Sequence, residues 1–481
     1  MFKFQMYKKL QANIGSIYQE AREVASTIGI PDNLKGKFGL TGAISGCPAP
    51  LREDISRYCE EGGKEVTPLA KLVDEIRELV KTYYGDEYDA APVNTCEAGL
   101  WVTFDSLFTP PSMGRGDNYR TRYLIPAEKH LHHHGGYGRP FPPRFKDVFA
   151  DRGSTAGEAG FSGKRQNNMD TLIVPMVGAE YPVHGIKYWP VPLLSGVDAE
   201  KTALKMAEVA GRHAGELTGI TSLGYETPGY GYGQKDEDGT PILQKRLAAL
   251  ANQYDIPYVI DNAWGIPFVG TDIRKTGAHV VIYSMDKASG ATTSGLVIGK
   301  EEYMVPIRRA LGMHGDRWGT TASYGKAAYV TQDPGKEALL GQIAAMKALL
   351  AKPEVVTQPV DDLYRVVEEE FAQLDASLRK GIIISKSHNS TAVEVNYEGT
   401  WANGQGIPIF TIEDMYAGSN ILQSGLAQMG VIPTIAYDAN IYISPGLGTT
   451  DEHGRLLEDR SRLAIKALVR LIEIVCKYAY N

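Results

Sequence analysis

Cysteine is scarce in this sequence, and long apolar runs are absent. Only four of the 481 residues are cysteine, and no two of them form a CxxC pair: Cys47, Cys59, Cys96 and Cys476. This spacing argues against a cysteine-based metal site and against a disulfide framework. The sequence also lacks an apolar stretch typical of a secretory signal or of a membrane span. We therefore expect a soluble, cytoplasmic protein without a membrane anchor.

An excess of basic residues is missing as well. Lys and Arg number 50 against 57 Asp and Glu, which gives a formal net charge of −7. Nucleic-acid binding usually requires a strongly basic surface, so this balance gives no support for a nucleic-acid partner. With 43% hydrophobic and 22% charged residues, the composition is that of a globular protein with a large core and two or three structural units.

Helical and strand patterns alternate from about residue 90 onward. Apolar periodicity predicts helices over residues 1–28, 65–83, 97–108, 199–214, 241–254, 362–379, 418–429 and 456–478. Short apolar runs predict strands at residues 123–125, 171–176, 218–224, 257–261, 279–284, 296–298, 381–385, 391–396, 408–412 and 440–444. This alternation indicates an α/β fold in which helices cover both faces of a mostly parallel sheet. We expect an N-terminal helical segment (1–89), a large α/β domain (90–335) and a small C-terminal α+β domain (336–481).

Two predicted strand ends carry residues whose chemistry fits one cofactor. One apolar run ends in Asp261, and the next leads into Ser284-x-x-Lys287. The 26 positions between Asp261 and Lys287 (287 − 261) allow both to emerge at the same edge of one sheet. A pyridoxal 5'-phosphate site needs a lysine that forms a Schiff base with the cofactor and an acid that protonates its ring nitrogen. Taken singly, the lysine could also be a solvated loop residue and the aspartate a turn former.

The phosphate of such a cofactor needs backbone N–H groups at a helix N-terminus early in the large domain. Residues 94–97 open the helix predicted at 97–108. We predict that the cofactor is contacted there and beside the aspartate and the lysine, by Thr95, Cys96, Glu97, Ala263 and Ser284. An ordinary helix N-cap would produce the same local pattern.

A histidine cluster at residues 130–134 invites three interpretations. Histidines adjacent on one loop rarely converge on a single ion, and no cysteine or carboxylate completes a ligand set, so we predict no metal site. The flat ring of His133 or His134 could instead stack on the pyridine of the cofactor. The cluster could also be structural or simply solvated.

Arginine is the usual partner of a substrate carboxylate, because its planar guanidinium matches both oxygens. Arg139, after a glycine-rich stretch, and Arg317, between two glycines at 315 and 319, are the positions that we predict to bind the substrate. Either could be an ordinary surface residue. The expected substrate is a small molecule of the amino acid type.

Asp261, the Ser284-x-x-Lys287 motif and the alternating order together resemble the fold type I, or aspartate aminotransferase-like, pyridoxal phosphate enzymes over about residues 90–470. Two stretches, 285–300 and 135–140, are similar to the selenocysteine synthase group and its sugar-amino-acid ammonia-lyase relatives. The first has the Asp-Lys and Gly-(apolar)3-Gly-Lys pattern, and the second the Gly-Gly-x-x-Arg pattern. The resemblance implies that Lys287 holds the cofactor, that the substrate reacts through an external aldimine and a Cα carbanion, and that the protein forms a homodimer or a higher homo-oligomer.

Two positions depart from that family. Tyr442 stands where many members carry the arginine that binds the substrate α-carboxylate, and Trp264 stands where many carry a polar residue. A lyase or a β-replacement reaction, similar to that of selenocysteine synthase, is therefore favoured over an aminotransferase. A non-catalytic cofactor-binding scaffold is a further alternative, against which the presence of both Asp261 and Lys287 argues.

Overall fold

The computed structural model describes residues 3–41, 47–108, 122–126, 139–141, 170–174, 176–178, 197–224, 233–313, 330–410, 421–434, 436–437 and 439–481. The described helices are α1 (Lys3–Ala12), α2 (Ile14–Thr27), α3 (Glu53–Lys64), α4 (Leu69–Tyr84), α5 (Cys96–Leu107), α9 (Ala199–Arg212), α10 (Ile242–Gln253), α11 (Ile273–Thr276), α12 (Glu301–Leu311), η3 (Val330–Gln332), α13 (Lys336–Ala351), α14 (Glu354–Phe371), α15 (Ala376–Arg379), α16 (Thr400–Asn403), α18 (Ile421–Gln428) and α19 (Glu458–Tyr480). The described strands are β1 (Tyr88–Val93), β2 (Arg122–Pro126), β3 (Arg139–Phe141), β4 (Asp170–Val174), β5 (Leu217–Leu223), β6 (Tyr258–Asn262), β7 (Val280–Ser284), β8 (Gly295–Lys300), β9 (Ile383–Ser387), β10 (Ala392–Asn396), β11 (Ala436–Tyr437) and β12 (Asn440–Ile443).

Eight of these strands form one large sheet in the order β1-β8-β7-β6-β5-β2-β4-β3. Neighbouring strands from β7 to β3 pair in parallel, whereas β8 is antiparallel to both β1 and β7. The mostly parallel sheet expected from the sequence is thereby confirmed. Strand β1 was not expected, because it is buried along its whole length and so lacks an alternating pattern. It also contains Pro92, which an edge strand tolerates.

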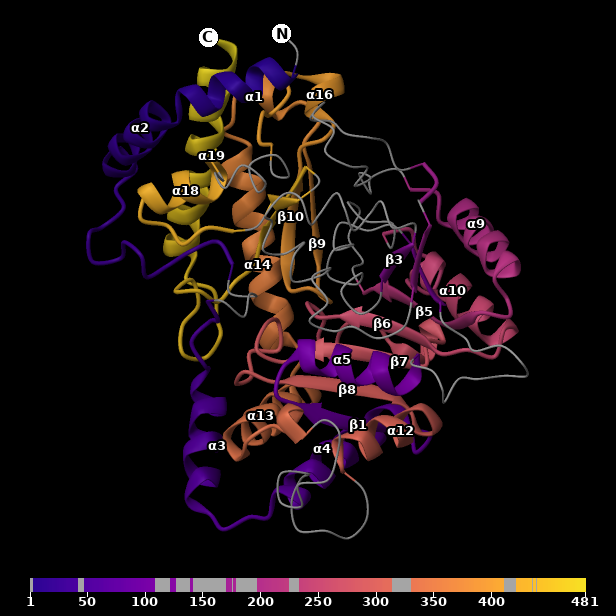
Figure 1. Ribbon diagram of the computed structural model, residues 1–481. Helices are drawn as coiled ribbons and strands as arrows, with labels where there is room; N and C mark the ends of the chain where they lie inside the picture. Colours follow the sequence, from indigo (N-terminus) through magenta and orange to yellow (C-terminus); the bar gives the residue numbers. More distant parts are fainter. Residues whose placement is uncertain are drawn as a thin grey trace.

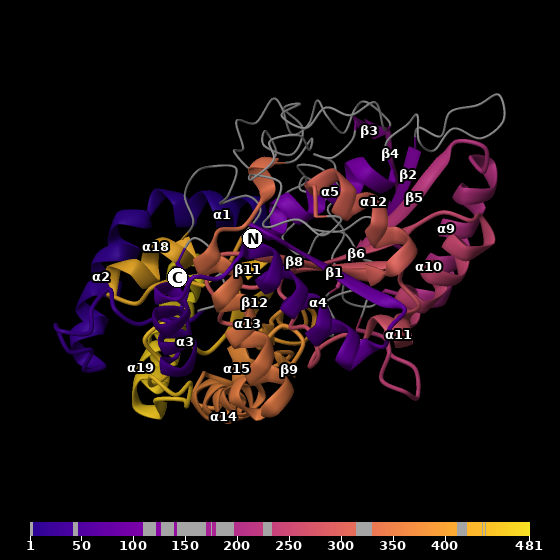
Figure 2. The ribbon, with the colours of Figure 1, turned by 90° about the horizontal axis from the view of Figure 1, so that it is seen from below.

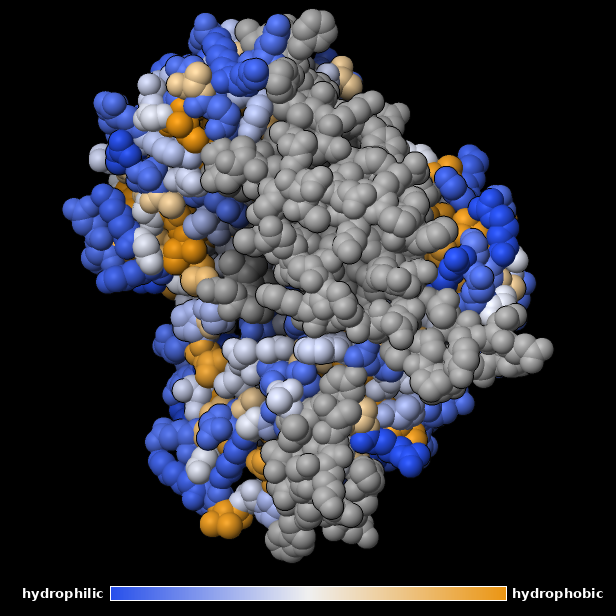
Figure 3. Space-filling view, viewed as in Figure 1, coloured by the Kyte–Doolittle hydropathy of each residue, from blue (hydrophilic) through white to orange (hydrophobic). Residues whose placement is uncertain are grey.

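Helices cover both faces of the large sheet (Figure 2). On one face α5 packs on β7 and β8, where Gly99 leaves room for the side chains of Ile282 and Val297. Helix α12 lies on the same face, while α4 and α10 pack on the opposite face against β1 and against β5 and β6. Outside the grey atoms, Figure 3 shows a mostly hydrophilic surface with scattered apolar residues. None of the described helices is long and apolar enough to span a bilayer.

The C-terminal part of the chain forms a smaller lobe. Its four-stranded antiparallel sheet has the order β11-β12-β10-β9, and α14 packs on β9 and β10. Helices α1 and α2 lie against α19 and α18, so the two chain ends are close together (Figure 1). The strand predicted at 408–412 is wrong for residues 408–410, which are buried but pair with no strand. A short apolar run alone does not distinguish a strand from a buried loop.

Two hydrophobic clusters fill the described part of the molecule. The larger cluster joins the large sheet to α3, α4 and α13, and the other joins the small lobe to α1 and α2. The segment 1–89 therefore contributes to both clusters, and α13 packs with the large sheet although it follows residue 335. The division of the chain into domains 1–89, 90–335 and 336–481 stays a prediction.

A buried histidine joins β6 to β7, the two strands that lead to Asp261 and Lys287. His279 is 2% exposed. Its Nδ1 accepts a hydrogen bond from the backbone N–H of Tyr258 at 2.9 Å, and its Nε2 lies 2.9 Å from Oδ1 of Asn252. The ring must be neutral to accept that bond. Burial, and then the charge of Lys300, lower the pKa of His279 from 6.5 to about 4.

We predict that stability falls as the pH falls from 6.5 towards 4, because the unfolded chain protonates His279 in this range and the native chain does not. The full effect is about 3 kcal/mol in the free energy of unfolding. Urea unfolding at several pH values should show a shallower pH dependence for His279→Gln than for the wild type. Equal slopes for His279→Gln and the wild type would contradict this assignment.

Candidate functional site

The carboxyl ends of several strands meet at one edge of the large sheet. In the parallel ladder, Asp261 of β6 lies between Leu223 of β5 and Ile282 of β7. The antiparallel strand β8 begins at the same edge, where Gly295 pairs with Ser284 on one side and with Val93 on the other. Open α/β sheets bind their ligands at such an edge.

Asp261 is a buried acid at this edge, with 3% of its surface exposed. Oδ1 of its carboxylate accepts a hydrogen bond from the backbone N–H of Ala263 at 3.1 Å. Its carbonyl oxygen accepts another from the N–H of Gly224 at 2.8 Å. The strand end and the turn after it therefore hold this carboxylate in place, and the predicted site residue Ala263 is one of its partners.

Lys287 lies in a tight turn between β7 and β8, and its side chain is half-buried. The N–H of Gly290 donates to the carbonyl of Lys287 at 3.1 Å, and the N–H of Met285 donates to the carbonyl of Ser294 at 2.9 Å. The hydroxyl of Ser284 donates to Oδ1 of Asp286 at 2.6 Å, and both side chains are buried. The turn thus has a fixed backbone, and contact of Ser284 with a cofactor phosphate stays a prediction.

The first turn of α5 lies at the same edge. Oγ1 of Thr95 accepts a hydrogen bond from the N–H of Ala98 at 3.0 Å, so Thr95 is the N-cap of this helix. Cys96 is buried and Glu97 is half-buried. The first amides of a helix have no carbonyl partner within it, and together with the helix dipole they favour an anion. Capping by Thr95 and anion binding by the following amides are compatible.

The thiol of Cys96 lies within electrostatic reach of both central residues. Burial raises the pKa of Cys96 well above its usual value, the charge of Asp261 raises it further, and the charge of Lys287 lowers it. The strand register independently places Asp261 and the turn with Lys287 at the edge of the sheet where α5 begins. The raised pKa also means that Cys96 is a neutral thiol and a poor nucleophile.

At this edge, the start of β8 packs directly against the backbone at the start of α5. A Cβ atom at Gly295 would lie 2.5 Å from the carbonyl carbon of Thr95 and 2.6 Å from the amide nitrogen of Cys96. Only glycine therefore allows β8 to approach the start of α5 this closely.

We predict that Gly295→Ala displaces the first turn of α5, because the added methyl group would overlap the backbone of Thr95 and Cys96. The change should cost about 1–3 kcal/mol in the free energy of unfolding, as overpacking does, and should weaken the binding of pyridoxal 5'-phosphate, measured by equilibrium dialysis. Gly63→Ala in α3 is the control, since no atom lies within 4 Å of its added methyl group. An unchanged affinity in a folded Gly295→Ala protein would show that the start of α5 does not contact the cofactor.

Two further contacts join the small lobe to this edge, and neither was expected from the sequence. The side chain of Asn389, which follows β9, is 2% exposed and donates to the carbonyl of Gly224 at 3.0 Å. It also exchanges hydrogen bonds of 3.1 Å with the side chain of Asn262, next to Asp261. The rings of Trp264 and Tyr442 lie 5.3 Å apart between centroids. Local sequence patterns carry no signal for pairs this far apart in the chain.

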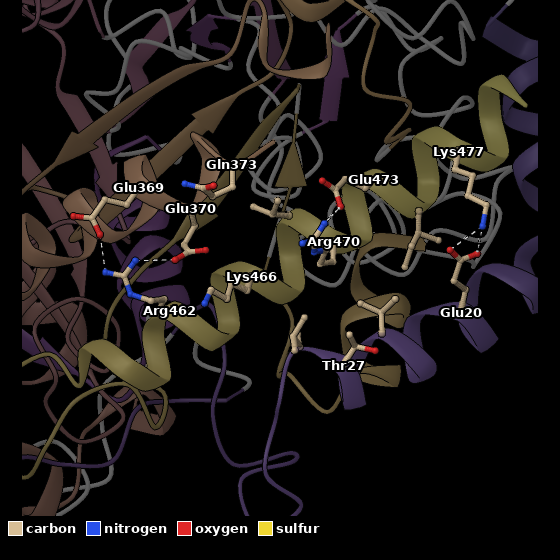
Figure 4. A pocket seen from close by; sticks show the side chains of 14 residues that line it. Glu20, Thr27, Glu369, Glu370, Gln373, Arg462, Lys466, Arg470, Glu473 and Lys477 are labelled. Carbon is tan, nitrogen blue, oxygen red and sulfur yellow. Dashed lines mark hydrogen bonds and ion pairs between the residues drawn. The ribbon is translucent and has the colours of Figure 1, made fainter. Parts of the chain in front are cut away.

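Lys287 lines a cavity of about 80 Å³. Arg52, which the sequence did not indicate as a site residue, lines the same cavity. The N-terminal segment, the turn after Lys287, α14 and the loop at 445–454 all contribute to its walls. A larger hollow of about 1160 Å³ lies between α2, α14 and α19 (Figure 4). None of the predicted site residues lines it, and most of its charged side chains form ion pairs, such as Lys477 with Glu20.

Several predicted site residues lie outside what the structure describes. His133, His134 and Arg317 are not among the described residues. Arg139 is the first residue of β3 and its backbone pairs with Asp170, but its side chain is not described. Among the described residues, no three His, Cys, Asp or Glu side chains are arranged to hold a metal ion.

No protein-family model and no curated protein sequence matches this chain. Solved structures do match along nearly all of it. The SepCysS–SepCysE N-terminal domain complex has a TM-score of 0.52 at 10% identity, covering 92% of this chain and 97% of that one. The taurine:2-oxoglutarate aminotransferase from Bifidobacterium kashiwanohense, solved with PLP and glutamate, has a TM-score of 0.52 at 12% identity, covering 87% and 85%.

A third similar structure is the pyridoxamine-pyruvate aminotransferase from Mesorhizobium loti, with a TM-score of 0.52 at 13% identity, covering 94% of this chain and 97% of that one. At these identities the similarity establishes the fold alone. The chain has the aminotransferase-like fold of the fold type I pyridoxal phosphate enzymes, which confirms the fold expected from the sequence.

Proposed function

We propose that this protein is a pyridoxal 5'-phosphate-dependent enzyme that acts on an amino acid or a related amine. The observation that carries the proposal is that the buried Asp261 and the turn with the half-buried Lys287 lie at the same edge of the large sheet, where α5 begins. This arrangement occurs in a fold whose similar structures include one solved with PLP.

The described residues offer a partner for three groups of this cofactor, namely its aldehyde, its ring nitrogen and its phosphate. Lys287 supplies a primary amine for its aldehyde, and Asp261 supplies a buried acid for its ring nitrogen. The amides at the start of α5 face the edge where a phosphate could bind, and Gly295 keeps the strand beside them free of a side chain. When bound, the cofactor withdraws electrons from the α-carbon of an attached amine.

The roles of the protein groups then follow from their positions. With the cofactor bound as proposed, the carboxylate of Asp261, held by the N–H of Ala263, would favour the protonated form of the ring nitrogen. Nζ of Lys287 would hold the cofactor and would also be the group that takes or returns a proton at the α-carbon of the amine. The contact of Trp264 with Tyr442 adds buried aromatic surface three residues after Asp261.

A lyase or a β-replacement reaction is the form of this chemistry that we favour. Tyr442 and Trp264 form a buried aromatic contact at the position where the aminotransferase pattern has a cation. An aminotransferase is the second candidate, because two of the three similar structures are aminotransferases. An elimination would release ammonia and a 2-oxo acid, whereas a transamination would leave the cofactor in its amine form. Bound cofactor without turnover over a broad amine panel would support the scaffold alternative.

A homodimer or a higher homo-oligomer, a cytoplasmic location and the absence of a nucleic-acid partner also belong to this proposal. They are supported by the resemblance to fold type I enzymes and by the net charge of −7. Substrate contacts by Arg139 and Arg317, and stacking by His133 or His134, remain part of the proposal in the same way.

We predict that the purified protein, incubated with pyridoxal 5'-phosphate, acquires a visible absorption band that borohydride bleaches while linking the cofactor to Lys287. Peptide mass mapping of the reduced protein identifies the labelled residue. Lys287→Ala should lose the band and the label, because Lys287 is the only lysine among the described residues that line this cavity. Lys300→Ala, which removes another half-buried lysine at the far end of β8, should retain both. Labelling of a different lysine in the wild type would overturn the assignment.

A further inference from the structure

The cavity at Lys287 contains a second cation that the proposed function does not use. Its walls are made mostly of small and apolar residues, among them Pro359, Val356 and Gly446. Arg52 and Lys287 are the only charged residues among its described lining, and no carboxylate faces it. Although Arg52 is also paired with Asp54, both charged groups of the lining are cations, which an anion in the cavity could contact.

Arg52 comes from the N-terminal segment, far from Lys287 in the sequence. Its side chain is 10% exposed. Nε and Nη2 of Arg52 donate to the two carboxylate oxygens of Asp54 at 3.1 and 3.3 Å. The side chain of Asp54 is half-exposed. Cδ lies close to Gly454, where a Cβ atom would be 2.9 Å away, so the side chain is held between this loop and the turn after Lys287.

The remaining nitrogen of the guanidinium lies on the side of Lys287. Nη1 of Arg52 is 3.6 Å from the position of a Cβ atom at Gly290, which also lines the cavity. Its N–H groups have no hydrogen-bond acceptor among the described residues. Nη1 of Arg52 is therefore free to donate to a ligand, or to water, in the cavity.

The volume of the cavity restricts what can bind there. About 80 Å³ is available, and roughly 10–15 Å³ of such space holds one water-sized group. A planar or tetrahedral oxyanion on a short carbon chain fits this space, and a bulky anion does not. The guanidinium matches the oxygens of such a group geometrically.

We propose that Arg52 binds the oxyanion of the amine that reacts at Lys287, so that the substrate is a small amine whose carboxylate lies a short distance from its amino group. This inference rests on the function proposed above, because it needs the cofactor to be attached at Lys287. It assigns the selection of anionic amines to Arg52, in addition to Arg139 and Arg317.

We predict that the cofactor-loaded wild type binds alanine about 10- to 100-fold more tightly than alaninamide, as a charge-assisted hydrogen-bonded pair would produce. The dissociation constants are measured from the change in the visible spectrum of the bound cofactor, without turnover. Arg52→Gln should lose this preference while its affinity for alaninamide stays unchanged. Arg57→Gln, at an exposed arginine one turn into α3, is the matched control and should behave as the wild type.

Two further amines identify the kind of oxyanion. Taurine carries a sulfonate and 2-aminoethylphosphonate a phosphonate in place of the carboxylate. If either binds more tightly than alanine, the oxyanion that Arg52 binds is a sulfonate or a phosphonate rather than a carboxylate. If Arg52→Gln does not fold, Arg52→Lys keeps the charge but loses the planar fork, and the preference should fall without vanishing.

The outcomes separate this inference from the proposed function. A wild-type protein that takes up no cofactor at Lys287 contradicts the proposed function itself. A wild-type protein that is labelled at Lys287 but binds alanine and alaninamide equally overturns only the role of Arg52. Arg52→Gln retaining the full preference for alanine does the same.

Discussion

The parallel pairing of β6 with β7 is the constraint on which the candidate site depends. In this register Asp261 lies opposite Ile282, so that the buried carboxylate and the turn with Lys287 emerge at one edge of the sheet. Successive strand residues point to opposite faces, so a slip by one residue would turn the side chain of Asp261 to the other face of the sheet. The hydrogen bond from the N–H of Tyr258 to the ring of His279 stabilises this register where the two strands begin.

Around this strand pair, the site is assembled from segments that are far apart in the sequence. The N-terminal segment contributes Arg52, and the small lobe contributes Tyr442 and Asn389. In β12, Ile441 and Ile443 pack within the small lobe, while Tyr442 between them packs with the core of the large sheet. The alternation of a strand thus gives the small lobe its own core on one face and a contact with Trp264 on the other.

The sequence predicted the parts of the site that depend on local order. Two strand ends could be predicted from local sequence alone. One apolar run ends in Asp261, and a second precedes Ser284-x-x-Lys287. The start of α5 was predicted to within one residue, because capping by Thr95 is a local signal. The mostly parallel sheet followed from the alternation of strands with helices.

The sequence did not predict the features that depend on long-range packing. Strand β1 is buried throughout and contains a proline, so neither its periodicity nor its composition marks it as a strand. Arg52 lies directly after a loop rich in proline and glycine, where nothing distinguishes it from a surface arginine. Asn389 and Asn262 are 127 positions apart, and only the folded chain brings their amides together.

The most direct test of the central claim is a crystal structure of the protein soaked with pyridoxal 5'-phosphate. We expect electron density for the cofactor that is continuous with Nζ of Lys287, and a ring nitrogen within hydrogen-bonding distance of the Asp261 carboxylate. A cofactor joined to Lys287 with its ring nitrogen away from Asp261, or one bound elsewhere in the molecule, would contradict it.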